Sequence, residues 1–319
     1  MRIEGAGVCA TDLHAIDGEM EPAGLTLPVV LGHENAGRIA AVGDLVTTVA
    51  VGDPVLISPP HTCGLCVPCR RGRDMMCVHH QFTGLTVDGG FAEYVVVSER
   101  SVVPLPEGMS PVDVAPYADA GITAYHAVKR VAGLAVPGAT VVCLGIGGVG
   151  HVGLQLVREL GSGATVVAVD PSPQRRALAA SLGADAVLDS GEVAEAVGDL
   201  TGGRGADLVL DFVGTDASHA AGIEMLVRGG TYSIIGFGGM VSVPSAAMVG
   251  KEITIVANLV GNWIDLWEVI QLHARGKLIL KTEMHPLEDV NDVLAKLREG
   301  EVTGRAVLVP DSSNGRERA

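Results

Sequence analysis

The sequence is poor in aromatic residues and in positive charge. Aromatic side chains make up only 3% of the 319 residues, against 48% hydrophobic residues overall, so its cores must be built from Val, Leu, Ile and Ala. The 22 Lys and Arg residues are outnumbered by 37 Asp and Glu residues, which gives a formal net charge of −15. This balance argues against nucleic acid or an anionic membrane surface as a partner.

The hydrophobic runs of secreted and membrane proteins are also missing. Residues 1–5 lack the apolar region of a signal peptide. The stretch 131–157 contains no charged residue, but seven glycines and Pro137 break it into a turn, a strand and a helix rather than a membrane span. Six cysteines, four of them between Cys63 and Cys77, indicate a metal cluster rather than a disulfide framework. We therefore expect a cytoplasmic protein with no membrane partner.

One stretch follows the order strand, glycine turn, helix, strand and acid. The apolar run 139–144 predicts a strand, and the turn GIGGVG (145–150) follows it. Residues 151–160 have apolar positions spaced for an amphipathic helix, and a second apolar run, 165–169, ends on Asp170. This order matches the dinucleotide-binding fingerprint, whose second strand ends on an acid about twenty residues after the glycines.

The glycines of this turn have separate physical roles. Gly145 permits the tight turn, Gly147 lets the backbone approach a pyrophosphate, and Gly150 lets helix and strand pack closely. The pyrophosphate is expected on the free N–H groups at the helix N-terminus. Asp170 can accept hydrogen bonds from ribose hydroxyls and would repel a 2′-phosphate, so it favours NAD over NADP, although Arg175 and Arg176 lie close enough in sequence to weaken this preference slightly. The predicted cofactor-binding residues here are Gly145, Gly147, Gly148, Gly150, Asp170 and Arg175.

Two patterns divide the chain. From Arg2 to about Pro116, short strands punctuated by Gly, Pro and Asp predict an antiparallel, barrel-like β domain. From about Gly121 to Ala257, strands alternate with helices, as a doubly wound parallel sheet requires. Further predicted strands include 37–43, 52–57, 91–97, 206–211, 231–235, 253–256 and 305–309, and helices are predicted at 265–275 and 287–299.

Four cysteines on one loop form the clearest metal motif. They are Cys63, Cys66, Cys69 and Cys77, spaced C-x2-C-x2-C-x7-C. Four soft ligands on a loop that glycines allow to curl are typical of a closed tetrahedral zinc site. Because thiolates fill all four positions, none is left for a substrate, and the predicted zinc is structural.

A second metal set is less certain from spacing. Cys9 lies in GVCATDLH (7–14), and His33 and Glu34 lie in GHE (32–34). Cysteine, histidine and carboxylate can hold zinc with one position open for substrate. Spacing alone leaves the question open, because a lone Cys and a lone His are more often core or surface residues.

Taken together, these motifs resemble the zinc-dependent alcohol dehydrogenases of the medium-chain dehydrogenase/reductase family, and most closely the bacterial NAD-dependent secondary-alcohol dehydrogenases. The motifs in the family's order are GVCATDLH (7–14), GHE (32–34), the cysteine lobe (61–80), DAGITAYHA (119–127) and GIGGVG (145–150). The resemblance covers essentially the whole chain. It implies a GroES-like antiparallel β-barrel catalytic domain, 1–120 and 259–319, and an α/β domain with a Rossmann sheet for NAD, 121–258.

The resemblance also implies a catalytic zinc centre. Cys9, His33 and Asp119 would ligate the ion, although many members have cysteine at the third place. Glu34 is similar to a nearby carboxylate that approaches the metal when ligands exchange. Asp12 is similar to the acid that orients the zinc histidine.

The implied reaction uses NAD and two zinc ions per chain, one catalytic and one structural. Zinc would polarise the alcohol oxygen, and the proton would leave through the Thr11 hydroxyl, a ribose hydroxyl of the cofactor and His14. Hydride would then pass to the nicotinamide, giving an aldehyde or ketone from a primary or secondary alcohol. Thr123 matches a nicotinamide-side contact of the family, and Arg305 matches an arginine near the cofactor phosphates.

Two alternatives stay open. A polyol or amino-alcohol dehydrogenase of the same family would share the metals and the cofactor. A non-catalytic zinc- and nucleotide-binding protein would follow if the chain lacks the roughly thirty residues that precede GVCATD in family members, since missing strands would uncover a sheet edge and lower stability. Relatives are dimers or tetramers, so we expect a homo-oligomer.

Overall fold

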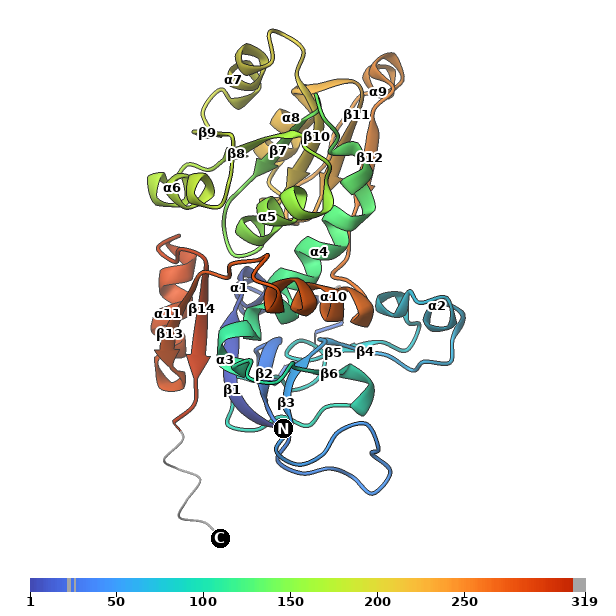
Figure 1. Ribbon diagram of the computed structural model, residues 1–319, viewed down its shortest axis with the longest axis vertical. Helices are drawn as coiled ribbons and strands as arrows, with labels where there is room; N and C mark the ends of the chain where they lie inside the picture. Colours follow the sequence, from blue (N-terminus) through green and yellow to red (C-terminus); the bar gives the residue numbers. More distant parts are fainter. Residues whose placement is uncertain (22–23, 26, 312–319) are drawn as a thin grey trace. The chain divides into compact units, whose positions relative to one another are not determined.

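The computed structural model describes residues 1–21, 24–25 and 27–311, which form two compact units (Figure 1). Unit 1 comprises Met1–Ile122, Asn262–Gly276 and Leu280–Ala319, and unit 2 comprises Thr123–Gly261 and Lys277–Ile279. No helix among the described residues is both long enough and apolar enough to cross a membrane.

A six-stranded sheet with the order β13-β14-β1-β2-β3-β6 forms the frame of unit 1. Its strands are β1 (Arg2–Val8), β2 (Glu34–Arg38), β3 (Pro54–Ile57), β6 (Val102–Pro104), β13 (Thr282–Pro286) and β14 (Arg305–Val309). All neighbours are antiparallel except β13 and β14, which run parallel. The antiparallel character predicted for this GroES-like domain is confirmed, and the parallel edge pair adds to it. Val55 and Ile57 of β3 lie fully buried in its core, without aromatic partners of comparable burial.

Short helices and turns join these strands (Figure 1). The helices of unit 1 are α1 (Ala10–Ile16), α2 (Val67–Arg70), α3 (Pro111–Val114), α10 (Trp263–Ala274) and α11 (Val290–Arg298). The 3-10 turns are η2 (Asp74–Met76), η3 (Glu99–Ser101), η4 (Ala115–Ala118) and η6 (Leu287–Asp289), and a small ribbon pairs β4 (Pro60–His61) with β5 (Gln81–Phe82).

The strand predicted at 91–97 is wrong. This segment makes bends and a single bridge, between Arg2 and Tyr94. β14 pairs with β1 only along Ala6–Val8, so the backbone groups on that side of the first residues of β1 can pair with another segment. Three hydrogen bonds join the two segments, from Ile3 N–H to the Glu93 carbonyl at 2.9 Å, from Val95 N–H to the Met1 carbonyl at 3.0 Å and from the Met1 amino group to the Val95 carbonyl at 2.8 Å. Contact over so few residues does not make a strand.

Unit 2 contains a six-stranded parallel sheet with the order β12-β11-β10-β7-β8-β9. Its strands are β7 (Thr140–Leu144), β8 (Thr165–Val169), β9 (Ala186–Leu188), β10 (Ala206–Asp211), β11 (Leu226–Ile234) and β12 (Thr254–Ala257). The predicted doubly wound Rossmann sheet is confirmed. The strand order reverses between β7 and β10, which is where such sheets bind ligands, beyond the carboxyl ends of the strands.

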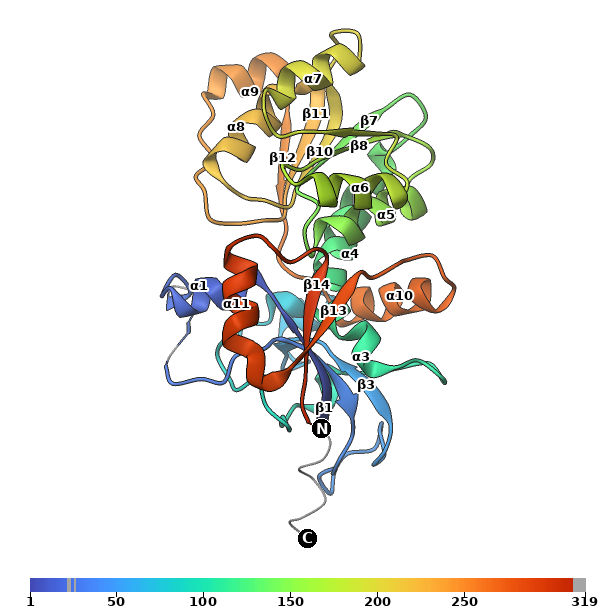
Figure 2. The same ribbon diagram turned by 90° about the vertical axis from the view of Figure 1, so that its left-hand side faces the viewer.

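Helices cover both faces of this sheet, with α5 and α6 on one side and α8 and α9 on the other (Figure 2). The helices of unit 2 are α5 (Gly150–Leu160), α6 (Pro173–Ser181), α7 (Val193–Leu200), α8 (Asp216–Glu224) and α9 (Ser245–Lys251). α4 (Ala120–Val131) leads into this unit and ends in η5 (Ala132–Leu134). The buried faces of β7 and β8 are almost entirely Val, Ala and Leu, as the low aromatic content requires.

Candidate active site

The four predicted lobe cysteines come together around α2. The ligand atoms of Cys63, Cys66, Cys69 and Cys77 all lie within 4.8 Å of one another. The Cys66 sulfur lies 3.4 Å from that of Cys69 and 3.8 Å from that of Cys77. A tetrahedron with Zn–S bonds of about 2.3 Å has an edge of about 3.8 Å, so the spacing fits zinc with little movement.

The loop backbone curls around the four sulfurs and directs N–H groups at one of them. Gly64 and Gly72 adopt positive φ angles of 70° and 69°, which let the chain curl around the cluster. Backbone N–H groups of Leu65 and Cys66 point at the Cys63 sulfur and lower the pKa of that thiol to about 6. The thiolate is the form that binds metal. The cluster is a structural four-cysteine zinc site.

Cys9, His33 and Asp119 form the second cluster, with ligand atoms again within 4.8 Å of one another. All three residues are buried. Asp119 Oδ2 lies 3.4 Å from Cys9 Sγ and 3.6 Å from His33 Nε2. The ligands come from the N-cap of α1, the residue before β2 and the C-cap of η4, so the fold unites three distant segments.

The state of His33 indicates a metal site. Its ring is almost wholly buried, yet neither ring nitrogen meets hydrogen-bond geometry with any residue the structure describes. Nδ1 lies 3.3 Å from Asp12 Oδ1, while Nε2 faces Cys9 and Asp119. A metal-bound imidazole is arranged in this way, with one nitrogen on the ion and the other directed at a carboxylate. The donor set therefore fits a zinc ion.

Electrostatics at this cluster favour positive charge. Burial lowers the pKa of His33, but the negative charge of Asp12 and the nearness of Asp119 raise it well above its usual range overall. Burial raises the pKa of Asp119, and His33 and Arg305 outweigh that effect and lower it. A buried site that holds a carboxylate ionised and attracts positive charge to its centre suits a dication.

A buried ion pair borders the same cluster. Arg305 Nη2 lies 2.6 Å from Glu34 Oε1, and its Nε lies 3.0 Å from both carboxylate oxygens. The same Nη2 is 3.3 Å from Cys9 Sγ and 3.4 Å from Asp119 Oδ2. Burial raises the pKa of Glu34 to about 6, against the opposing effect of Arg305.

Space for this pair comes from β1. A Cβ on Gly7 would lie 1.8 Å from Glu34 Oε2, so the carboxylate occupies the place that any larger residue would take. The Ala120 N–H also donates to Glu34 Oε1 at 3.0 Å. The pairing of Arg305 with Glu34 was not predicted, because no local signal connects two residues 271 positions apart.

The predicted relay residues share the helix that begins at Cys9. Asp12 Oδ2 accepts the Cys9 N–H at 2.8 Å and so caps α1. Thr11 Oγ1 lies 3.6 Å from Cys9 Sγ. His14 is partly exposed, and its Nδ1 pairs with Glu19. Thr11 and His14 are three residues apart, which places them on one face of the helix.

The glycine turn of unit 2 has the geometry expected of each glycine. Gly145 has a φ of +83°, and a Cβ on Gly150 would lie 1.8 Å from the Gly145 carbonyl oxygen. A Cβ on Gly147 would meet nothing within 4 Å, so this backbone faces open space. The N-cap of α5, Val149, makes no side-chain cap, and the N–H groups of His151 and Val152 donate to the Gly147 and Val149 carbonyls at 3.1 and 3.2 Å.

Asp170 follows β8 and is buried beside this turn. Its Oδ2 accepts the Ile146 N–H at 2.8 Å, and its Oδ1 accepts the Ser172 N–H at 2.9 Å. The acid of the fingerprint is thus tied to the glycine turn itself. Arg175 lies in α6, where its N–H donates to the Ser172 hydroxyl at 3.4 Å, and Thr123 lies in α4.

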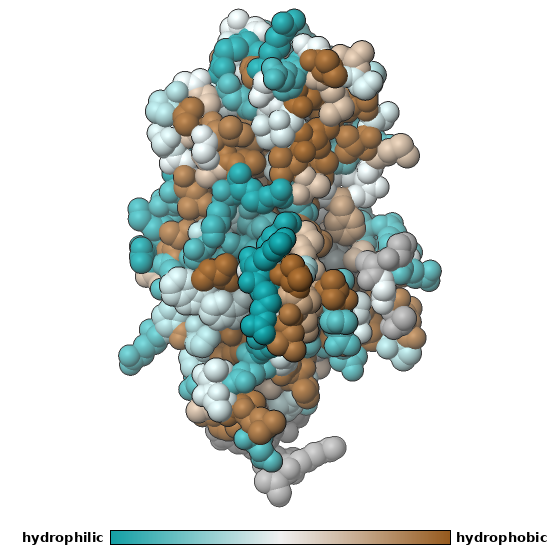
Figure 3. Space-filling view, turned by 90° about the vertical axis from the view of Figure 1, so that its right-hand side faces the viewer, coloured by the Kyte–Doolittle hydropathy of each residue, from teal (hydrophilic) through white to brown (hydrophobic). Residues whose placement is uncertain are grey.

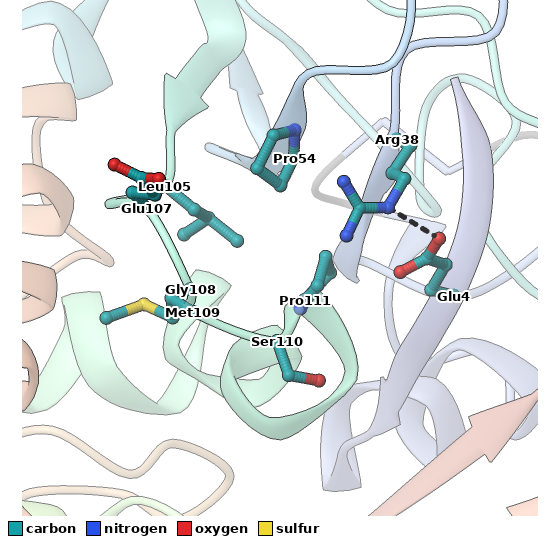
Figure 4. Close-up of a pocket in the computed structure, with 9 residues that line it drawn as sticks. All are labelled: Glu4, Arg38, Pro54, Leu105, Glu107, Gly108, Met109, Ser110 and Pro111. Carbon is teal, nitrogen blue, oxygen red and sulfur yellow. Dashed lines mark ion pairs between the residues drawn. The ribbon is translucent and has the colours of Figure 1, made fainter.

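One further pocket, of about 690 Å³, lies in unit 1 (Figure 4). It is lined by Glu4, Arg38, Pro54, Leu105, Glu107, Gly108, Met109, Ser110 and Pro111. Arg38 Nε pairs with Glu4 Oε1 at 3.2 Å across one wall, as Figure 4 shows. The pocket shares no residue with either metal cluster.

Comparison with known proteins agrees with this geometry. The family "Alcohol dehydrogenase GroES-like domain" matches residues 1–107, and the family "Zinc-binding dehydrogenase" matches residues 148–275. The alcohol dehydrogenase of Aeropyrum pernix is 44% identical in sequence, with a TM-score of 0.94, over 97% of this chain and 91% of that one.

Two curated relatives extend the comparison. The NAD-dependent alcohol dehydrogenase of Sulfurisphaera tokodaii is 33% identical over 97% of this chain and 92% of its own length. The D-arabinose 1-dehydrogenase (NADP(+)) of Saccharolobus solfataricus is 35% identical over 97% of this chain and 89% of its own length.

Fold, glycine turn and the two clusters define a zinc-binding dehydrogenase with one structural and one catalytic metal site. More narrowly, the chain belongs to the family of zinc-dependent medium-chain alcohol dehydrogenases. The family-level resemblance inferred from the sequence motifs is confirmed.

Proposed function

We infer that this protein is a zinc- and NAD-dependent alcohol dehydrogenase, of the class EC 1.1.1. It transfers a hydride between an alcohol and NAD, giving an aldehyde or ketone. The observation that carries this inference is the buried cluster of Cys9, His33 and Asp119. A negatively charged residue, Asp12, lies beside His33, and a positively charged one, Arg305, lies beside Asp119. Three protein ligands leave the fourth position of a tetrahedral zinc open, which is the pattern of catalytic rather than structural zinc sites.

Each residue of unit 1 has a separate task in this proposal. Cys9, His33 and Asp119 hold the ion, and Asp12 keeps the His33 ring turned so that Nε2 faces the site. When bound, zinc acts as a Lewis acid on the substrate oxygen. Glu34 remains a candidate for a transient ligand, although Arg305 and the Ala120 N–H engage its oxygens.

The proton path that we propose starts at Thr11 and ends at His14. The Thr11 hydroxyl passes the proton of the substrate hydroxyl onward, and His14 releases it to solvent. Support comes from their shared helix face and from the exposure of the His14 side chain, at 26%. An imidazole ring can both accept and donate a proton, which suits this exchange.

For the cofactor we propose the glycine turn with Gly145, Gly147, Gly148 and Gly150, together with Asp170, Arg175 and Thr123. The Asp170 carboxylate favours NAD because it would repel a 2′-phosphate. The ion pair of Arg305 with Glu34 supports a role in balancing charge at the metal centre. A contact from Arg305 to the cofactor phosphates stays a prediction. We assign the catalytic domain to 1–120 and 259–319 and the NAD domain to 121–258.

The substrate class is the least constrained part of the proposal. We propose secondary alcohols first, from the likeness of the motifs to secondary-alcohol dehydrogenases. Sugars and other polyols are the second candidate, because one relative of comparable similarity is named D-arabinose 1-dehydrogenase. Side-by-side turnover of a secondary alcohol, a primary alcohol and D-arabinose separates the two.

We further propose a homo-oligomer in the cytoplasm. β12 forms an edge of the sheet of unit 2, and Met240 and Val249, which lie between β11 and β12 in the sequence, are 74% and 81% exposed. Figure 3, which views the side where α9 and β12 lie, shows hydrophobic residues gathered on unit 2. Exposed apolar surface beside a sheet edge is typical of an interface. Six free cysteines favour a reducing compartment.

The test is the zinc content of protein purified without added metal, together with NAD reduction over that panel of alcohols. Two zinc ions per chain and alcohol-dependent NADH formation are expected. One zinc ion and no turnover with any alcohol would overturn the proposed function and would favour a non-catalytic zinc- and nucleotide-binding protein.

A further inference from the structure

A buried polar network lies at the carboxyl end of β10, and none of its residues has a role in the proposed function. Asp211 is fully buried, and its Oδ2 accepts the Ser218 hydroxyl at 2.7 Å and the Tyr232 hydroxyl. His219 Nδ1 lies 2.7 Å from the Tyr232 oxygen and 3.3 Å from Asp211 Oδ2. Burial raises the pKa of Tyr232, and its bond to Asp211 adds to this, so the phenol keeps its proton and donates it.

The second oxygen of the same carboxylate holds the loop that follows β10. Asp211 Oδ1 accepts the N–H of Val213 at 2.8 Å and that of Gly214 at 3.0 Å. Gly214 has a φ of +77°, so the chain turns sharply here. One side chain therefore joins β11 and α8, through Tyr232 and Ser218, to the segment Phe212–Gly214.

That segment forms a wall of the glycine turn. A Cβ on Gly153 would lie 2.3 Å from Phe212 Cζ, and one on Gly145 would lie 2.6 Å from Val213 Cγ2. Asp211 also stands opposite Leu144, the last residue of β7 before the turn. The glycines of α5 and of the turn are thus in contact with the side chains of 212–213.

The opposite side of this segment is enclosed by the loop after β11. A Cβ on Gly236 would lie 2.5 Å from the Val213 carbonyl carbon. The Gly239 N–H donates to the Gly214 carbonyl at 2.6 Å. Three loops at the carboxyl edge of the sheet therefore pack backbone against backbone, and Asp211 anchors the middle one.

We propose that Asp211 is a positioning residue for the cofactor: with Tyr232, it fixes the segment 212–214 against the glycine turn and so sets the shape of the dinucleotide site. The proposal rests on the proposed function, since it takes NAD as the ligand. A buried carboxylate that accepts from four donors allows only one arrangement of the loops that carry them. Apolar packing alone would tolerate several arrangements. Neither Asp211 nor Tyr232 needs to touch the cofactor.

The chain offers a matched control on the same strand. Asp207 lies at the other end of β10, where its carboxylate accepts the Thr140 N–H at 2.7 Å and pairs with Arg204. Asp211→Asn and Asp207→Asn therefore make the same chemical change to a carboxylate that holds a neighbouring backbone N–H. Only Asp211 faces the edge where the glycine turn lies.

The experiment titrates NAD into purified, zinc-loaded wild type and both variants, and also measures turnover at saturating NAD. In Asp211→Asn a donating amide nitrogen replaces one accepting oxygen, so the hydrogen bonds to that oxygen must break or reverse, and we expect the Kd for NAD to rise roughly tenfold or more. Turnover at saturating NAD should stay within about twofold of wild type, and Asp207→Asn should bind NAD as wild type does. Faster hydrogen exchange of the Val213 and Gly214 amides is expected in Asp211→Asn alone.

Tyr232→Phe is a second test of the proposal, for the case in which the Asp211 variant does not fold. It keeps the ring and removes one donor, and the Kd for NAD should rise by roughly threefold. A Kd unchanged in both Asp211→Asn and Tyr232→Phe, or raised equally in Asp207→Asn, overturns this inference alone. Failure of wild type to bind NAD overturns the proposed function and this inference with it.

Discussion

The two metal clusters differ in how the chain builds them. The four-cysteine cluster takes all its ligands from 63–77, on a loop that is partly exposed. The cluster of Cys9, His33 and Asp119 is wholly buried, and two of its ligands lie 110 residues apart. A cluster on one loop can form wherever that loop curls. A cluster drawn from distant segments exists only when the whole sheet of unit 1 is in place.

Their surroundings differ as well. Backbone N–H groups stabilise the lobe thiolates, whereas charged side chains surround the buried cluster. Backbone N–H groups cannot move independently of the loop, so they suit a structural zinc ion that is never exchanged. Side chains such as Arg305 and Glu34 can be substituted one at a time, so the buried cluster allows more tests of the difference between the two metal sites.

Loss of Cys9 should have the largest effect. Cys9→Ala removes one of three unlike ligands, so zinc should fall from two ions per chain to one, and turnover should drop by about a thousandfold or more. Cys143→Ala is the matched control, since Cys143 is a buried cysteine of β7 outside both clusters. Metal analysis and NAD reduction measure both variants. Two zinc ions in Cys9→Ala would show that the cluster does not depend on this ligand.

Breaking the buried ion pair should come next. Arg305→Met leaves Glu34 buried without its cation, which typically costs about 3–5 kcal/mol in the free energy of unfolding. Denaturant unfolding of the zinc-loaded protein measures the loss. The double variant Arg305→Met with Glu34→Gln should recover part of it, because the stranded charge is gone. Equal stability of wild type and Arg305→Met would mean that the pair contributes nothing to the frame of the cluster.

Loss of the lobe zinc should act on stability more than on turnover. Cys66→Ser should remove one zinc ion and lower the free energy of unfolding by about 2–3 kcal/mol, or the melting temperature by roughly 5–10 °C. Turnover per remaining zinc ion at 25 °C should stay close to that of wild type. A thermal melt and an assay on one preparation test both statements, and abolished turnover would remove the distinction between the two clusters.

The proton path should show the smallest effect. His14→Gln should lower turnover roughly tenfold at neutral pH, and the deficit should shrink as pH rises because hydroxide can then take the proton. His79→Gln, on the exposed part of the lobe, should leave the pH profile unchanged. A pH profile that His14→Gln leaves unaltered would exclude His14 from the path.

Local pattern predicted one strand of each unit to the residue. The strands at 206–211 and 305–309 were predicted at the bounds the structure has, because apolar runs between turn residues need no distant information. The lobe cysteines were predictable from spacing. Assigning Asp119 as a ligand needed resemblance to a family, since no spacing in the sequence connects it with Cys9.

Long-range contacts account for what the sequence did not predict. The pairing of Arg305 with Glu34 depends on β14 and β2 lying on either side of β1, which no spacing reveals. The segment 91–97 has the composition of a strand, but the start of β1 offers it only a short free edge. Asp211 did have a signal, since it ends a predicted strand as Asp170 does.

The start of α1 concentrates much of the chemistry of unit 1. Cys9, Thr11, Asp12 and His14 lie within six consecutive residues, on the N-cap and the first turns of one helix. Inserting a single residue after Cys9 would rotate the other three by about 100° around the helix axis. The number of residues in this segment is therefore as constrained as the identity of its four functional side chains.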